Sequence, residues 1–199
     1  YSITAIEGSL NGPTFACPGS TCSVPLNEGN NSFTFWALSS YGDSSSQGAF
    51  TAKVDTVSPN VAMGVSGSMG ANGWYIGPAV VSATATDTTS GVNTLLISDN
   101  GGPGKPSPVT LNNGIHAITI TATDQAGNSK SISQTVKVDT NGPVIAPSAL
   151  GTSGVNGWYR SAVDLSATSA DALAGVQGNV EISLDNGASW ADLPIHFTD

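Results

Sequence analysis

Residues 53–92 decide the fold, and they have the sequence KVDTVSPNVAMGVSGSMGANGWYIGPAVVSATATDTTSGV. The pattern returns without insertion or deletion at residues 137–176, which have the sequence KVDTNGPVIAPSALGTSGVNGWYRSAVDLSATSADALAGV. A single offset, which we call the repeat offset, thus carries Lys53 onto Lys137 and Asp55 onto Asp139. Self-similarity at a fixed period is the signature of a tandem repeat, so we predict small modules in series rather than one large domain.

Three copies of the repeat are expected, of which one is complete. Residues 53–136 form the complete copy, and residues 137–199 form the N-terminal part of the next. Residues 1–52 form the C-terminal part of an earlier copy, because an offset one position longer than the first matches three apolar pairs: Val24 and Val109, Leu26 and Leu111, Ala37 and Ala122. Half a sandwich exposes an unpaired edge and an apolar face. We therefore expect further chain or a neighbouring copy to cover both partial copies.

Alternation of apolar and polar residues predicts strands throughout. It is seen at residues 33–37, 49–54, 81–86, 116–123 and 131–138, whereas no window repeats apolar residues at helical spacing. Glycine, proline, asparagine and aspartate separate these segments, as turns require. About seven short strands in a repeat of this length are typical of an antiparallel Greek-key sandwich, so we predict an all-β protein.

The charge and the scarcity of catalytic residue types narrow the function. The net charge of −9, with only five Lys and Arg, opposes binding to a phosphate backbone, so we expect no nucleic-acid partner. The chain has two histidines, no acid and base set at a familiar spacing and no glycine-rich phosphate loop. We therefore predict that it is not an enzyme.

The two cysteines, Cys17 and Cys22, enclose the turn-forming sequence PGST. Such a turn can hold the two sulfur atoms within bonding distance, and we predict a disulfide. The alternatives are two reduced thiols, or a zinc site for which His116 and His196 lack the usual spacing. A disulfide would pin one hairpin and would place the protein outside the cytoplasm.

The order of short motifs resembles that of the bacterial immunoglobulin-like repeats of cell-surface and secreted proteins. These motifs are GWY at 73–75, ATD at 85–87, SGV at 90–92, ATDQAGN at 122–128 and LDNGASW at 184–190, with VDT at both repeat boundaries. The resemblance implies tandem immunoglobulin-like Greek-key β-sandwiches, one complete and two partial, in an extracellular or cell-surface protein. Fold alone does not specify a ligand.

Three functions follow as expectations from this resemblance. The first is a structural segment of a surface stalk, an adhesin or an envelope layer, whose partners are neighbouring repeats. The second is a self-assembling filament or sheath in which strands of one copy complete the next. The third is a carbohydrate-binding accessory module with surface polysaccharide as its partner. None of the three needs a membrane span or a cofactor within this segment.

Oxygen-bearing side chains suggest a calcium site as one alternative. Asp124 and Asn128, next to the boundary residue Asp139, resemble the loops with which Ca²⁺ stiffens junctions between extracellular sandwiches. The competing interpretation is that these residues cap turns through their own backbone. The first copy favours turn capping, because it has Ser39 and Asp43 at the positions of Asp124 and Asn128. The turn residues Asp87 and Asp171 are weaker candidates.

Aromatic residues at matching positions of the repeat are the remaining candidates for a contact surface. An aromatic platform for sugars would use the tryptophans and tyrosines of the two GWY motifs, while packing is the commoner role of repeated aromatics. A further tryptophan lies in a loop that has none in the complete copy. The five residues are Trp74, Tyr75, Trp158, Tyr159 and Trp190.

Overall fold

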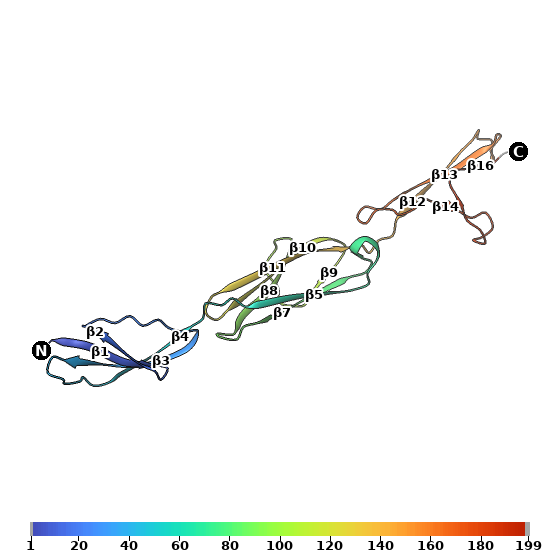
Figure 1. The fold of residues 1–199 in the computed structure, drawn as a ribbon. Helices are drawn as coiled ribbons and strands as arrows, with labels where there is room; N and C mark the ends of the chain where they lie inside the picture. The colour runs from blue at the N-terminus through green and yellow to red at the C-terminus, as the bar shows by residue number, and fades with distance from the viewer. Residues whose placement is uncertain (1, 198–199) are drawn as a thin grey trace. The chain divides into compact units, whose positions relative to one another are not determined.

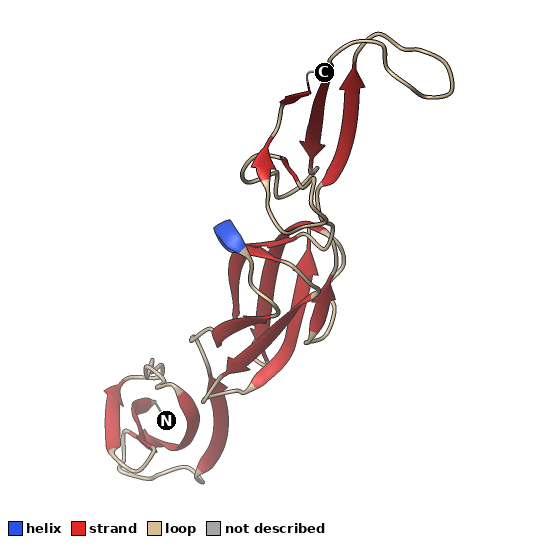
Figure 2. Ribbon diagram, turned by 90° about the vertical axis from the view of Figure 1, so that its right-hand side faces the viewer, coloured by secondary structure: helices blue, strands red, loops and turns tan. Residues whose placement is uncertain are grey.

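The computed structural model describes residues 2–197, which form an all-β protein as predicted (Figure 1). In chain order the strands are β1 (Ile3–Leu10), β2 (Thr14–Pro18), β3 (Gly29–Ser39), β4 (Gly48–Val54), β5 (Asn60–Ser66), β6 (Trp74–Tyr75), β7 (Ala79–Thr86), β8 (Val92–Asp99), β9 (Val109–Leu111), β10 (Gly114–Asp124), β11 (Ser129–Val138), β12 (Val144–Leu150), β13 (Val163–Ala170), β14 (Glu181–Ile182), β15 (Ala191–Asp192) and β16 (Ile195–Phe197). One short 3-10 helix, Ala71–Gly73, precedes β6 (Figure 2).

The first sheet has the strand order β2-β1-β3-β4, with antiparallel neighbours. The alternation predicted at residues 33–37 lies within β3, where Phe33 pairs with Phe50 of β4. Their rings lie 5.1 Å apart between centroids, so both side chains are on one face of the sheet. The predicted disulfide joins Cys17 in β2 to Cys22, and the two Cα atoms are 5.6 Å apart.

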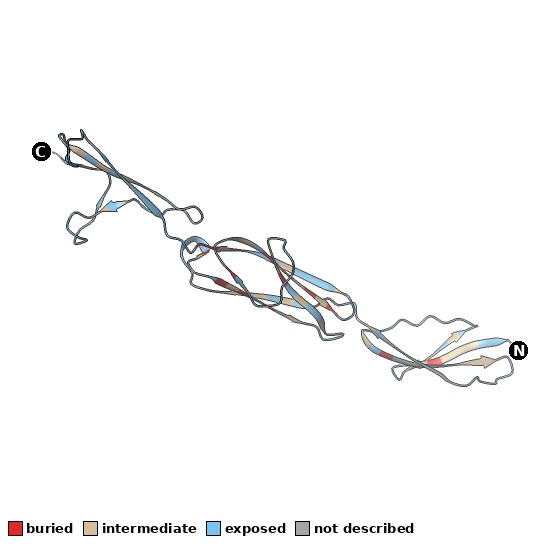
Figure 3. Ribbon diagram, turned by 180° about the vertical axis from the view of Figure 1, so that it is seen from behind, coloured by how far each residue is buried: buried red, intermediate tan, exposed pale blue. Residues whose placement is uncertain are grey.

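The central strands form two sheets, β6-β11-β10-β8 and β5-β7-β9. In the larger sheet β10 pairs antiparallel with β8, whereas the two-residue strand β6 runs parallel to β11. The buried hydrophobic residues among those described all belong to these central strands. Figure 3 colours the ribbon by burial and shows buried residues along these strands. The buried hydrophobic residues are Trp74, Ala79, Val81, Ala83, Ile97, Leu111, Ile118, Ile120, Ala122, Val136 and Val138. Alternate residues of β7 and β10 are buried, as expected for strands with one face towards the core of a sandwich.

The last strands form a three-stranded sheet, β12-β13-β16, and the short hairpin β14-β15. β12 pairs with β13 along its whole length, from Val144 opposite Ala170 to Leu150 opposite Asp164. Every residue of β12 is exposed, and the inward residues of β13 are only half-buried. This sheet therefore has the strand pattern of a sandwich layer without a buried core.

Contacts between residues divide the chain into two compact units. The first comprises the residues up to 64 together with 81–109 and 117–134, and the second comprises 65–80, 110–116 and the residues from 135 onward. Strands β10 and β11 contribute to both units. The boundaries of the three repeat copies therefore stay a prediction from the sequence. No helix among residues 2–197 is long and apolar enough to cross a lipid bilayer.

Candidate functional site

Three aspartates meet where three strands of the first compact unit end. Asp55 follows β4, Asp87 follows β7, and Asp124 is the last residue of β10. One carboxylate oxygen from each lies within 4.8 Å of the others. Asp124 is buried, whereas Asp55 and Asp87 are half-buried. The topology thus gathers acidic residues that are far apart in the sequence.

Asp124 closes the turn between β10 and β11. Its Oδ1 atom accepts hydrogen bonds from the backbone amides of Gly127 at 2.7 Å and Asn128 at 2.9 Å. Its Oδ2 atom accepts a third, at 2.9 Å, from the Asn128 side chain. That same amide group also donates to the Asp55 carbonyl at 3.0 Å. The pair Asp124 and Asn128, predicted as neighbours, therefore ties this turn to the chain that enters the central strands.

Asp87 and Asp55 hold the turn that follows β7. The Asp87 Oδ1 atom accepts hydrogen bonds from the amides of Thr89, Ser90 and Gly91 at 3.2, 3.0 and 2.8 Å. The Asp55 Oδ2 atom accepts one from the Ser90 amide at 3.0 Å. The Ser90 side chain, together with the amides of Val57 and Ser90, lowers the pKa of Asp55, and partial desolvation opposes this effect. The ionised form of Asp55 is therefore the one this turn stabilises.

The three clustered aspartates could bind a cation, and they also stabilise the surrounding turns through hydrogen bonds. Carboxylate oxygens are the ligands that Ca²⁺ prefers, and three neighbouring negative charges repel one another unless a cation or donors offset them. Each of the three carboxylates already accepts backbone N–H groups, which supply such donors. Three carboxylates that could together hold a cation are those of Asp55, Asp87 and Asp124, while the predicted set of Asp124, Asn128 and Asp139 stays a prediction.

Asp139 lies at the equivalent junction, within the second compact unit. Its Oδ2 atom accepts a hydrogen bond from the Ala174 amide at 2.9 Å, as Asp55 accepts one from Ser90. Its neighbour Asp171 accepts hydrogen bonds from the amides of Leu173 and Gly175, both at 3.0 Å. The Leu173 amide is the largest cause of a lowered pKa at Asp171. The hydrogen bonds of Asp139 and Asp171 thus match those of Asp55 and Asp87.

A second contact also repeats: the threonine of each VDT boundary motif donates hydrogen bonds to a side chain in the loop before a long strand. Thr56 donates to the Glu28 carboxylate from its amide at 3.1 Å and also from its hydroxyl group. At the next junction Thr140 donates to Asn113 Oδ1 from its amide at 2.7 Å and its hydroxyl at 3.3 Å. Sequence reasoning missed the roles of Glu28 and Asn113. The available signal was the alignment of the first copy with the complete one, which places Glu28 on Asn113.

The first copy shows that the turn after a β10-type strand forms without an aspartate. Ser39 occupies the position of Asp124, and its Oγ atom accepts hydrogen bonds from the amides of Tyr41 and Asp43, both at 3.2 Å. The Ser39 amide donates to the Asp43 carbonyl at 2.8 Å, just as the Asp124 amide donates to the Asn128 carbonyl at 3.0 Å. A hydroxyl acceptor is thus sufficient for this turn.

The candidate contact aromatics differ between copies. Trp74 is 8% exposed, and the Lys137 ammonium lies 5.3 Å from the centroid of its ring. Trp158, its counterpart, is 76% exposed, and Trp190 is 63% exposed. Tyr75 is half-buried, and Tyr159 is exposed, as are both of these tryptophans. The structure thus packs the aromatic pair of the complete copy and leaves the later aromatics at the surface.

Neither a protein-family model nor a curated protein sequence matches this chain.

Proposed function

We propose that this chain is a structural segment of an extracellular protein in which β-sandwich modules follow one another, as in a stalk, an adhesin arm or an envelope layer. The observation that supports this most is the repetition of the linker contacts. Glu28 with Thr56 and Asp55 with Ser90 are matched one repeat later by Asn113 with Thr140 and Asp139 with Ala174. A linker held by the same hydrogen bonds at each junction suits a part that keeps spacing or transmits load.

The proposed location outside the cytoplasm is supported by the disulfide between Cys17 and Cys22. Disulfides persist in oxidising compartments and are rare where thiols are kept reduced. A loop closed by so few residues gains little stability from chain entropy. The bond therefore ties the end of β2 to the segment that follows it, which suits a segment exposed to proteases and to mechanical load.

Pulling single molecules of the full chain by its two ends tests the mechanical role. We expect one resistant unfolding event from the central strands, residues 60–138, because the buried core lies there. At about 3.4 Å per residue this event releases roughly 25 nm of chain. A chain that extends without any resistant event would contradict a load-bearing role. Ile120→Ala, which removes part of that core, serves as the control and should lower the unfolding force.

A second candidate role is self-assembly by strand complementation. It is favoured by the apolar side chains that the first and last sheets leave exposed, among them Phe35, Phe50, Val144, Ile145 and Leu150. Exposed apolar faces and unpaired edges are typical of surfaces that associate.

A further inference from the structure

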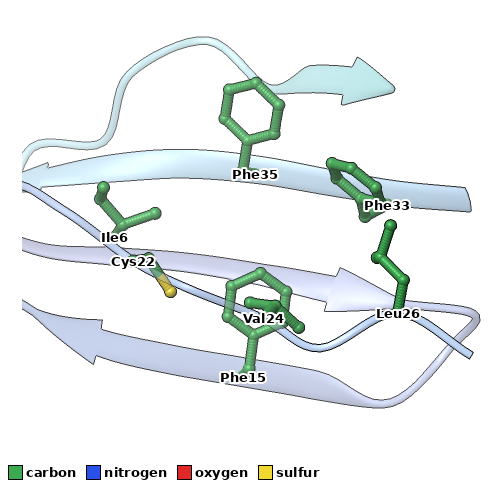
Figure 4. Close-up of a pocket in the computed structure, with 7 residues that line it drawn as sticks. All are labelled: Ile6, Phe15, Cys22, Val24, Leu26, Phe33 and Phe35. Atoms are coloured by element: carbon green, nitrogen blue, oxygen red, sulfur yellow. The ribbon is translucent and has the colours of Figure 1, made fainter. Parts of the chain in front are cut away.

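The two faces of the first sheet differ in chemistry. One face has an apolar groove of about 350 Å³, to which Phe33 and Phe35 of β3 contribute their rings (Figure 4). Successive side chains of a strand point to opposite faces, so Asn30 and Ser32 of the same strand lie on the other face. Both of these residues are exposed, whereas Asn31 between them is fully buried. The start of β3 therefore presents a polar, open surface.

Asn30, Asn31 and Ser32 form the sequence asparagine-x-serine, which is the acceptor motif for N-linked glycans. The motif occurs once in the chain. In the complete copy the aligned residues 115–117 have the sequence IHA, so the motif is specific to the first copy. N-linked glycans are bulky groups at the surface of secreted proteins, and the inference therefore rests on the proposed extracellular location.

The side chain of Asn31 holds the backbone so that Asn30 faces solvent. The Asn31 Oδ1 atom accepts a hydrogen bond from the Asn27 amide at 3.1 Å, and its Nδ2 atom donates one to the Asn27 carbonyl at 2.7 Å. By contrast, no group among residues 2–197 forms a hydrogen bond with the side-chain amide of Asn30. A group can therefore be attached to Asn30 without the loss of an existing side-chain contact.

A polar pocket of about 390 Å³ has Asn30 at its edge. Its volume lies within the range of pockets that hold small ligands, about 300–1,000 Å³. Amide, carboxylate, hydroxyl and ammonium groups line it, and these groups can pair with the hydroxyl and acetamido groups of a sugar. Besides Asn30, the polar lining residues are Lys53, Asp55, Thr89, Ser90 and Gln125, all of the first compact unit.

We propose that Asn30 carries an N-linked glycan whose first sugar lies in this pocket. The Asn30 Nδ2 atom bonds to the anomeric carbon of the sugar, while the bond between that carbon and the diphosphate of a lipid-linked donor breaks. The amide loses one proton, and the diphosphate leaves with the electron pair. A glycosyltransferase catalyses the transfer. Because Asn30 is directly opposite Lys53 in the ladder of β3 and β4, the glycan also shields this end of β4.

Mass spectrometry of the chain isolated from the cells that naturally produce it tests the modification. The tryptic peptide that ends at Lys53 should exceed its sequence mass by at least one sugar, and fragmentation should place this added mass on Asn30. In the same cells Ser32→Ala should abolish the added mass and Ser32→Thr should retain it, because the motif accepts either hydroxyl residue. An unmodified peptide from the natural source overturns the proposal.

The rate of tryptic cleavage after Lys53 tests whether the first sugar lies in the pocket. We expect the glycosylated chain to be cut about tenfold more slowly than the Ser32→Ala chain, because the sugar holds the cleavage site closed. Cleavage after Lys137, at the boundary without the motif, is the internal control and should be equal in both chains. Gln125→Ala should accelerate cleavage after Lys53 in the glycosylated chain and leave it unchanged in the Ser32→Ala background.

If Gln125→Ala does not change cleavage of the glycosylated chain, the sugar lies outside the pocket and the proposal is overturned. The proposed structural role is tested separately by the pulling experiment. A chain that lacks the glycan and still shows the resistant unfolding event would leave that role intact.

Discussion

Asp124 is the most deeply buried of the three clustered aspartates, and its side chain holds the turn between β10 and β11. It is 1% exposed, and both of its carboxylate oxygens accept hydrogen bonds from the turn to β11. Removing an acceptor from buried donors costs more than the bond itself contributes, because the donors are left without a partner. The first copy, with Ser39 at this position, shows how little of the side chain the turn requires.

We therefore expect Asp124→Ala to lower the free energy of unfolding by about 2–3 kcal/mol, in line with the loss of hydrogen bonds to a charged group. Asp124→Ser should cost only about 1 kcal/mol, because its hydroxyl restores an acceptor for the turn amides. Both variants remove the same negative charge from beside Asp55 and Asp87, so relief of repulsion cancels in the comparison. Urea denaturation followed by far-UV circular dichroism measures the difference. Equal losses would mean that the turn does not depend on an acceptor here.

Asp185 is the residue for which we predict a measurable titration. Hydrogen bonds from the Ser189 side chain and amide, and then from the Ser183 hydroxyl, lower its pKa from 3.8 to about 2. Because the folded pKa is the lower one, Asp185 stabilises its loop above about pH 4 and loses this effect as the pH falls towards 2. Ser189→Ala should raise the pKa, while Ser189→Thr keeps the hydroxyl and should not. Carboxyl NMR titration that gives an unshifted Asp185 would contradict the loop geometry.

At the scale of the strand, the alternation of apolar and polar residues in the sequence correctly predicted the positions of five strands: β3, β4, β7, β10 and β11. It could not predict how deeply each strand is buried, because that depends on which second layer lies over it. Trp74 and Trp158 belong to identical motifs. Trp74 lies in β6, which pairs with β11, whereas Trp158 lies in no strand. The meeting of Asp55 with Asp87 and Asp124 was missed for a related reason, since it depends on strand ends that only the topology brings together.

Matched truncations in β10 and β3 test this dependence on the second layer. Ile120→Ala removes a fully buried side chain and should cost about 2–5 kcal/mol, as large-to-small changes in a core do. Phe35→Ala changes the corresponding position of β3, which is 44% exposed, and should cost below about 1 kcal/mol. Denaturation at low protein concentration compares them. Similar losses at the two positions would show that the first sheet has a core of its own.

At the scale of the whole molecule, the contact between Thr56 and Glu28 at the first repeat boundary is matched by that between Thr140 and Asn113 at the second, with a different acceptor group. Glu28 is a carboxylate and Asn113 is an amide, but each accepts from the amide and hydroxyl of the threonine that begins the linker. Each contact joins a loop before a long strand to the end of the neighbouring strand, as at the first junction, where Gly29 pairs with Val54 close to Thr56. Loss of either contact should therefore loosen the adjacent strand end and leave the other junction unchanged.

Trypsin provides a readout at both junctions, because Lys53 and Lys137 are the third residues before Thr56 and Thr140. Glu28→Ala should increase the rate of cleavage after Lys53 several-fold and leave cleavage after Lys137 unaltered, and Asn113→Ala should do the reverse. Proteolysis of an opened state follows the free energy of local opening, so the rates report on each contact separately. Mass spectrometry of early time points assigns the cuts. If both variants accelerated both cuts alike, the two junctions would open as one cooperative unit, and the idea of independent, equivalent linkers would have to be abandoned.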